Sequence, residues 1–248
     1  MLDLAADPNL FQYVLRYRQG EWRATIFRDL IRADFQNSRA TSAPVVLDIG
    51  CGRGFDGDPC LQSSLAAAAS SYVGVEPDPD VDLASLFSTV HRCSFEAAPI
   101  PDGSVDLAFT VMVLEHLDDP AKFWNKVHAV LRPGGVFWGF TMDARHWFVR
   151  ASLLAKRLRV KDVYLNWLHG RRGDERYENY PVRYRSNTPE QLDRLTSAFQ
   201  SRGVLSIGKV GQLDYYFPTG LRGLGRALDR RAIQRGDVGS LLAVRVVK

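Results

Sequence analysis

Short apolar runs alternate with stretches of helical periodicity along most of this chain. Apolar positions between residues 8 and 38 recur at roughly helical spacing, and Gly20 falls at a break that predicts two helices. Runs rich in β-branched and aliphatic residues predict strands at 45–49, 72–76, 89–93, 105–110, 135–141, 204–209 and 241–247. Further helices are predicted near 61–70, 80–87 and 120–131, and from 189 to about 201, with Thr188 as N-cap, Pro189 at the first helical position and Gly203 as the stop. Strands that alternate with helices predict an α/β fold with a doubly wound sheet.

The strand predicted at 45–49 runs directly into a glycine-rich loop. Asp48 and Ile49 are followed by Gly50-Cys51-Gly52-Arg53-Gly54. In an open α/β sheet, glycines at the end of a strand allow a nucleotide-like ligand to lie against the main chain. A dinucleotide site usually has the spacing G-x-G-x-x-G, which differs from the spacing here. A carboxylate at Asp48 pointing into the loop would repel a pyrophosphate and would suit a ligand that carries an ammonium group and no phosphate.

The loop resembles motif I of the class I S-adenosylmethionine-dependent methyltransferases. Three further segments resemble that family in the same order along the chain: Tyr72–Asp78, Ser94–Thr110, and Val111–Pro120 together with Val130–Phe137. The last pair is similar to the "vLEHl-x-dP" and "L-x-PGG" signatures of the small-molecule branch of these enzymes. Together the four segments cover roughly residues 45–142.

The resemblance implies a Rossmann-like, seven-stranded mixed sheet with a helical lid insertion, and S-adenosyl-L-methionine as the cofactor. Glu76 ends the second core strand, where an acid hydrogen-bonds the ribose hydroxyls. Ser94 stands where the family often has an aspartate that meets the adenine amino group, and Phe95 brings an aromatic ring that can stack on adenine. The implied cofactor-binding residues are Asp48, Gly50, Cys51, Gly52, Gly54, Glu76, Pro77, Ser94, Phe95, Thr110, Val111 and Met112.

The 248 residues are expected to form a single domain with four parts. Residues 1–40 form an N-terminal helical cap, in which Tyr13, Arg16 and Arg18 are candidates to reach the cofactor carboxylate. Residues 41–142 are the cofactor-binding core, 143–187 are a lid and acceptor insertion, and 188–248 complete the sheet.

The lid region mixes aromatic, leucine and basic residues. Residues 146–168 form a basic amphipathic stretch, a pattern that fits packing on the same domain or contact with an acidic membrane surface. Residues 177–189 resemble a stretch found in bacterial methyltransferases of glycan or specialised-metabolite pathways. Residues 214–218 are expected to complete the acceptor pocket from the other side.

The net charge of +4 is unevenly distributed. Residues 144–187 carry +7, residues 221–235 carry +4, and the rest of the chain carries −7. This asymmetry favours an anionic acceptor or partner, with a solvated basic face as the alternative. Cys51, Cys60 and Cys93 are odd in number and lack metal-ligand spacing, which indicates reduced thiols. With no apolar run of membrane-spanning length and no basic leader, a cytoplasmic location is expected, and the oligomeric state is open.

The chemistry requires a base only if the acceptor is a hydroxyl group that must lose its proton. Histidine is the usual choice near neutral pH. His116 follows the fourth core strand, and a structural or cofactor-packing role is expected for it; His146 and His169 lie in the lid, and His146 is the better base candidate. No cluster of ligating residues predicts a metal.

The favoured function is methyl transfer to a small molecule, by O-methylation of a sugar, a glycolipid or a specialised metabolite. An RNA methyltransferase is one alternative, motivated by the basic lid. Against it, the chain has no recognisable RNA-binding module, and Thr110–Val113 replaces the Asn/Asp-Pro-Pro-aromatic motif of base-amino methylation. A non-catalytic scaffold on a methyltransferase fold is the other alternative, and a nicotinamide-dependent oxidoreductase fits the glycine spacing least.

Overall fold

A computed structural model gives the fold and describes residues 1–37, 43–52, 54–55, 57–169, 180–236 and 238–248. Its centre is an eight-stranded sheet with the order β1-β7-β8-β6-β5-β2-β3-β4. The strands are β1 (Leu2–Asp3), β2 (Val45–Ile49), β3 (Ser71–Val75), β4 (Thr89–His91), β5 (Val105–Val111), β6 (Leu131–Met142), β7 (Ser201–Ile207) and β8 (Leu241–Val247). β8 is antiparallel to both of its neighbours, β6 and β7, and the other paired strands are parallel. The predicted α/β class with a mixed sheet is confirmed.

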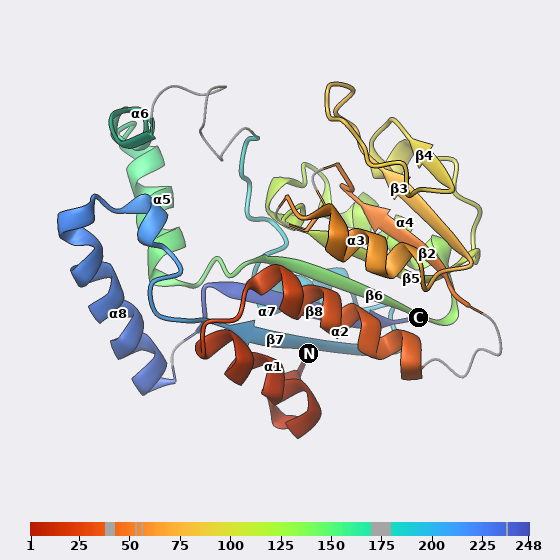
Figure 1. Ribbon diagram of the computed structural model, residues 1–248, viewed down its shortest axis with the longest axis horizontal. Coiled ribbons are helices and arrows are strands. Elements are labelled where there is room, and N and C mark those ends of the chain that lie inside the picture. The colour runs from red at the N-terminus through yellow and green to blue at the C-terminus, as the bar shows by residue number, and fades with distance from the viewer. Residues whose placement is uncertain (38–42, 53, 56, 170–179, 237) are drawn as a thin grey trace.

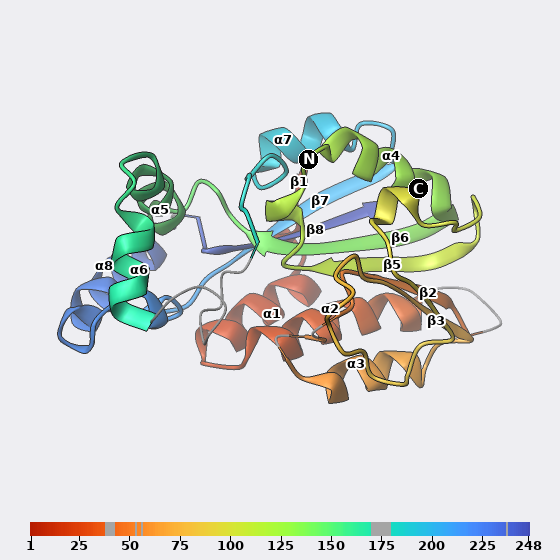
Figure 2. The same ribbon diagram turned by 90° about the horizontal axis from the view of Figure 1, so that it is seen from above.

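Helices cover both faces of the sheet (Figure 2). α1, α2 and α3 lie on one face and α4 and α7 on the other, and each layer has its own buried apolar cluster. The helices are α1 (Pro8–Arg18), α2 (Arg23–Asn37), α3 (Pro59–Ala66), α4 (Pro120–Val130), α5 (Trp147–Arg157), α6 (Lys161–His169), α7 (Pro189–Leu195) and α8 (Arg222–Arg235). A parallel strand between two helical layers is buried on both sides, which explains why β2 and β5 are almost continuously apolar.

The predicted strand count of seven was wrong, because a short edge strand precedes the leader helices. β1 pairs in parallel with β7 through Leu2 and Gly203. Gly203 was predicted to stop a helix that ran to about residue 201, but that helix ends at Leu195 and Gly203 lies inside β7. A Cβ atom at Gly203 would come 2.4 Å from Leu4 Cδ2, so the glycine lets the residues after β1 pack closely on the sheet edge.

The helix predicted near 80–87 is absent, and this prediction was wrong. The chain between β3 and β4 forms turns and bends instead. The Asp78 side chain accepts a hydrogen bond from the Asp80 amide, which closes a turn where the helix was predicted to begin. Arg92 then donates to the carbonyl groups of Asp78 and Val81 and holds this irregular segment in place.

The lid lies beyond the end of β6 and stands apart from the two helical layers (Figure 1). The lid contains the helices α5 and α6, which belong to the segment predicted as a helical insertion. It also contains α8, which the sequence analysis did not predict as a helix. Arg159, between α5 and α6, has a left-handed φ of 60° that turns the chain from one helix to the next. Within the described residues, no helix combines the length and apolar character needed to cross a membrane.

Candidate active site

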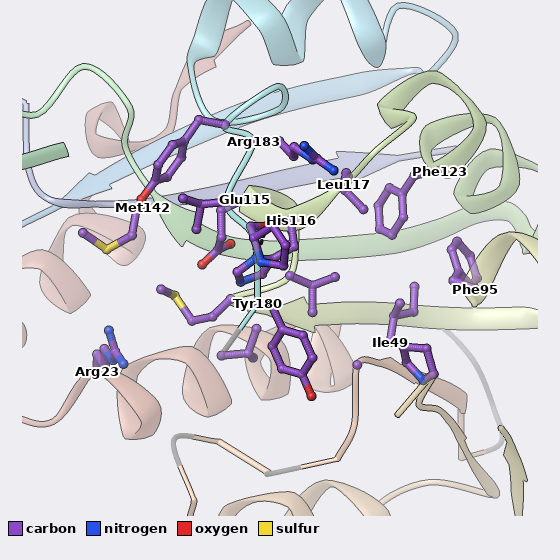
Figure 3. A pocket seen from close by; sticks show the side chains of 18 of the residues that line it. Arg23, Ile49, Phe95, Glu115, His116, Leu117, Phe123, Met142, Tyr180 and Arg183 are labelled. Atoms are coloured by element: carbon purple, nitrogen blue, oxygen red, sulfur yellow. Dashed lines mark hydrogen bonds between the residues drawn. The ribbon is translucent and has the colours of Figure 1, made fainter. Parts of the chain in front are cut away.

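A large cavity lies between the ends of the parallel strands and the lid. Its volume is about 1220 Å³, which exceeds the roughly 300–1,000 Å³ of common single-ligand pockets. Loops that follow β2, β3 and β5 line one end of it, which we call the cofactor end. The α1–α2 junction, α5 and residues 209–216 line the other end, which we call the acceptor end (Figure 3).

Backbone bonds shape the cofactor end. The Gly50 amide donates to the Val75 carbonyl at 2.8 Å, and the Gly52 amide donates to Glu76 Oε2 at 2.9 Å. A Cβ at Gly52 would come 2.5 Å from that same oxygen, so the loop and the carboxylate can meet only because residue 52 is glycine. The other Glu76 oxygen accepts the Asp78 amide at 2.9 Å. Each carboxylate oxygen retains a further lone pair, and Glu76 faces the cavity, so it can still accept ribose hydroxyl groups.

Asp48 lies beneath the glycine loop and does not line the cavity. Its Oδ2 accepts hydrogen bonds from Gln62 Nε2 at 2.6 Å and from the Tyr72 hydroxyl at 2.8 Å. Gln62 Nε2 also donates to the Cys51 carbonyl at 3.0 Å. Burial raises the Asp48 pKa to about 7. The structure therefore gives Asp48 a bracing role under the loop, in place of the expected carboxylate that faces an ammonium group.

The remaining predicted cofactor residues divide into two groups. Those that line the cavity are Gly50, Gly54, Glu76, Pro77, Ser94, Phe95, Val111 and Met112. Those that lie behind this lining are Asp48, Cys51, Gly52 and Thr110. Thr110 is buried and its hydroxyl donates to the Ile49 carbonyl at 2.7 Å, joining β5 to β2. Cys51 is buried, and burial raises the pKa of its thiol.

Phe95 lines the cavity with most of its ring buried. It is 5% exposed and packs edge-on against Phe123, with ring centroids 5.2 Å apart. Ser94 precedes it, is exposed, and makes no capping hydrogen bond to the short helix that follows. Both side chains line the cavity, and their contact with adenine stays a prediction.

His116 lines the cavity, and a neighbouring carbonyl group determines which tautomer its neutral ring adopts. Nδ1 lies 2.9 Å from the Pro181 carbonyl oxygen, which can only accept. The proton of the neutral ring is therefore on Nδ1, and Nε2 keeps a free lone pair. This is the arrangement that a general base needs.

His146 does not line this large cavity. It caps α5 by accepting the Phe148 amide at Nδ1, 3.3 Å away, and it lines a separate cavity of about 140 Å³. Burial lowers its pKa to about 4. The structure does not bring His146 together with His116, and the side chain of His169 lies outside the described residues, as do residues 177–179.

Glu115 is a cavity residue to which the sequence analysis gave no role. It is 3% exposed, and burial raises its pKa. Its Oε2 accepts a hydrogen bond from the Thr141 hydroxyl at 2.7 Å, and Asn187 Nδ2 donates to that hydroxyl oxygen at 2.6 Å. An acid between apolar residues in Val113-Leu114-Glu115-His116-Leu117 is the one sequence signal that points to it.

Residues 180–184 cross the cavity and form what we call the strap. The Tyr180 hydroxyl donates to the Asp78 carboxylate, and the Arg183 and Tyr184 amides donate to the Glu115 carbonyl at 2.6 and 3.1 Å. Figure 3 shows Tyr180 and Arg183 projecting into the cavity beside His116. The strap thus joins the loop after β3 to the loop after β5.

Two cations lie at the acceptor end. Burial lowers the pKa of Lys209, and the nearby charge of Arg23 lowers it further. Lys209 Nζ lies 4.7 Å from the centroid of the Tyr17 ring. The leader residues named as candidates are placed differently, since Arg16 pairs with Glu21 and Asp29, and Tyr17, Trp22 and Arg23 line the cavity instead. Among the described residues, no three His, Cys, Asp or Glu side chains gather as a metal site requires.

The sheet, with β8 antiparallel between β6 and β7 and with a glycine loop and an acid after adjacent parallel strands, has the fold of solved S-adenosylmethionine-dependent methyltransferases. Residues 47–139 match the model of a family described as a methyltransferase domain.

Relatives and solved structures agree with this assignment. An uncharacterised methyltransferase of Mycobacterium sp. (strain JLS) is 35% identical over 111 residues, which are 42% of this chain and 42% of that protein. A probable S-adenosylmethionine-dependent methyltransferase of Mycolicibacterium smegmatis is 35% identical over 97 residues, 37% of this chain and 35% of its own length. The chain thus matches less than half the length of these relatives.

Solved structures share the fold at low identity. A methyltransferase from Thermotoga maritima, described as a possible histamine N-methyltransferase, has a TM-score of 0.52 and 15% identity and covers 97% of this chain and 99% of its own. Phosphoethanolamine N-methyltransferase 2 of Haemonchus contortus, solved with S-adenosylhomocysteine, has a TM-score of 0.55 and 14% identity, covering 98% of this chain and 57% of its own.

Proposed function

We propose that this protein transfers a methyl group from S-adenosylmethionine to a hydroxyl group of a small, anionic acceptor, such as a sugar, a glycolipid or a specialised metabolite. One observation carries the proposal: a single cavity holds the glycine loop and Glu76 at one end and His116, Arg23 and Lys209 towards the other. A cavity of this size has room for a nucleoside cofactor and for a second ligand.

The residues at the cofactor end fit a nucleoside with an aminoacyl tail. Gly50 and Gly54 line the cavity, and Gly52 behind them lets the loop approach Glu76, where a Cβ would clash with the carboxylate. Glu76 would hold the ribose hydroxyls, and Ser94 and Phe95 would contact the adenine. When bound, the cofactor supplies an electrophilic methyl group, and the protein contributes position and a dry environment.

His116 would act on the acceptor. Its Nε2 would accept the hydroxyl proton while Nδ1 keeps its own proton and donates it in a hydrogen bond to the Pro181 carbonyl oxygen, which fixes the ring and stabilises the charge that it gains. Met142, Phe148 and Tyr216 supply apolar surface around the acceptor end and restrict water there. Arg23 and Lys209 provide the positive charge that an anionic acceptor would meet.

Calorimetric titration with S-adenosylmethionine and S-adenosylhomocysteine, with NAD as the control, is the first test. We expect micromolar binding of the first two and none of NAD. Acceptor pools would then be screened for S-adenosylhomocysteine production. Binding without turnover in any pool would favour the scaffold alternative, and RNA binding that falls steeply with salt, together with RNA-dependent turnover, would favour the RNA methyltransferase.

A further inference from the structure

The lid presents apolar side chains to solvent on all three of its helices. Trp167 is 71% exposed, Val163 70%, Leu158 62%, Leu224 60% and Leu154 58%. These are large side chains, and exposed apolar surface of this extent commonly marks an interaction site.

The exposed side chains follow helical spacing. They form three stripes: Leu154 and Leu158 at the end of α5, Val160 just before α6 with Val163 and Trp167 on that helix, and Leu221 just before α8 with Leu224 and Leu228 on that helix. Buried side chains of the same segments, such as Val149 and Leu165, already serve the protein interior. The lid helices therefore have an outward apolar stripe in addition to their packed face.

Basic residues flank these stripes. Around α5 and α6 they are Arg150, Lys156, Arg157, Arg159 and Lys161, and on α8 they are Arg222, Arg226, Arg230, Arg231 and Arg235. These ten cations outnumber the acids of the same helices and the adjoining segment, which are Asp162, Asp214 and Asp229. Asp229 of α8 is buried, where it accepts the Gly211 amide, and Asp214 engages only Arg226 of the α8 arginines named here. We call this combination of stripes and cations the lid surface.

We propose that the lid surface docks on an anionic lipid bilayer. Outward Leu, Val and Trp side chains can enter the boundary between headgroups and acyl chains, while arginines and lysines pair with the anionic headgroups. Charge complementarity selects this partner, because a second copy of the chain would bring the same positive charge against itself. α6 and α8 lie on the side of the lid away from the sheet, where a bilayer can approach without meeting the core (Figure 1).

Docking would bring the acceptor end of the cavity near the headgroups. Phe148 and Ser152 of α5 line the cavity, as do Tyr215 and Tyr216 of the segment that joins the sheet to α8. Tyr164 of α6 donates to the Tyr216 carbonyl at 2.8 Å, so the helix that carries Trp167 is connected to the cavity wall. The proposal does not require methyl transfer, and it can be tested on the protein alone.

Vesicle flotation of the 248-residue chain tests the proposal. We expect binding to phosphatidylcholine vesicles that contain phosphatidylglycerol and little binding to pure phosphatidylcholine. Val163→Ser with Trp167→Ser, and separately Arg230→Glu with Arg231→Glu, should each weaken binding by about tenfold or more. Leu2→Ser with Arg194→Glu removes an exposed apolar residue and an exposed cation outside the lid, and should leave binding unchanged.

Titration with S-adenosylhomocysteine separates loss of docking from loss of the fold. All of these variants should bind it as the unaltered chain does, because none of the changed residues lines the cavity. Absence of flotation with anionic vesicles, or flotation that the lid variants do not weaken, would overturn the proposal. A concentration-dependent dimer lost in the apolar variant, or RNA binding lost in the charge variant, without vesicle binding, would assign the surface to those partners instead.

Discussion

The two ends of the cavity are built in different ways. At the cofactor end, consecutive loops of the sheet hold one another through main-chain amides, which donate from Gly50 to the Val75 carbonyl and from Gly52 to the Glu76 carboxylate. At the acceptor end, side chains converge from segments far apart in sequence, including Arg23, Phe148 and Lys209. A site made from adjacent strand ends appears in the sequence as a motif, whereas a site assembled from remote segments leaves none. Changes at the two ends should accordingly affect different measurements.

His116→Ala should give the largest effect, on the acceptor side alone. Loss of a general base costs about 10²–10⁴-fold in rate. We expect kcat to fall within that range while S-adenosylhomocysteine affinity stays within about twofold. His128→Ala is the matched control, since His128 contacts Phe199 and does not line the cavity. A variant with unchanged kcat would remove His116 from the chemistry.

Asp48→Asn should change how stability depends on pH. In the folded protein Asp48 keeps its proton up to about pH 7. In the unfolded chain, where its pKa has the ordinary value of 3.8, Asp48 loses the proton at a much lower pH. Asp48 therefore adds on the order of 4 kcal/mol to the free energy of unfolding below pH 4, and this stabilisation is lost as the pH rises to 7. Asparagine can still accept from Gln62 and Tyr72 but cannot ionise, so this loss should vanish from denaturant unfolding curves.

His146 provides an internal reference for that experiment. Because burial lowers its pKa to about 4, it contributes stability above pH 6.5 that is lost as the pH falls to 4. This loss should remain in Asp48→Asn, as should the contribution of Glu115. The difference between the two stability curves isolates Asp48, and a flat difference would contradict its buried, protonated state.

Glu76→Gln should weaken the binding of S-adenosylhomocysteine at the cofactor end, and this effect should be smaller than those of the two variants above. A hydrogen bond to a charged group contributes about 1.5–3 kcal/mol, so S-adenosylhomocysteine should bind about 10–100-fold more weakly. Glu96→Gln is the control, because Glu96 is an exposed acid that lines the same end. Equal losses in the two variants would mean that Glu76 has no special contact with the ligand.

Tyr180→Phe should have the smallest effect, and it tests whether the strap restrains a ligand at the cofactor end. It removes the bond from the strap to Asp78 and keeps the ring. At about 1 kcal/mol for one hydrogen bond, release of S-adenosylhomocysteine in stopped-flow experiments should accelerate about fivefold. An unchanged release rate would show that the strap does not restrain the ligand.

The cofactor end could be predicted from sequence because its determinants are local. β2 and β8 have the predicted bounds, since each is a nearly continuous apolar run. The glycine spacing and Glu76 indicated the site because both follow strands directly. Asp48 was misplaced because the sequence does not show which partner a carboxylate faces, and here Gln62 and Tyr72 turn it towards the interior.

The acceptor end could not be predicted because its contacts are tertiary and often involve main-chain atoms. The strap is held at the Glu115 and Pro181 carbonyls, which carry no side-chain signature. The helix predicted near 80–87 is replaced by turns, because Asp78 closes a turn at Asp80 and the remote Arg92 binds the carbonyl groups of Asp78 and Val81. Nor does periodicity reveal that α5 and α6 would each keep an apolar stripe exposed as well as one buried.

Met112 lines the cavity immediately after β5 and has a φ of 56°, in the left-handed region. For a residue with a side chain this conformation costs about 1–2 kcal/mol, and the 2.7 Å bond from its amide to the Phe140 carbonyl holds it there. Glycine would relieve the strain and remove the thioether from the cavity wall. The strain at position 112 is therefore accompanied by two contacts that glycine would lose, one with the buried apolar cluster and one in the cavity wall.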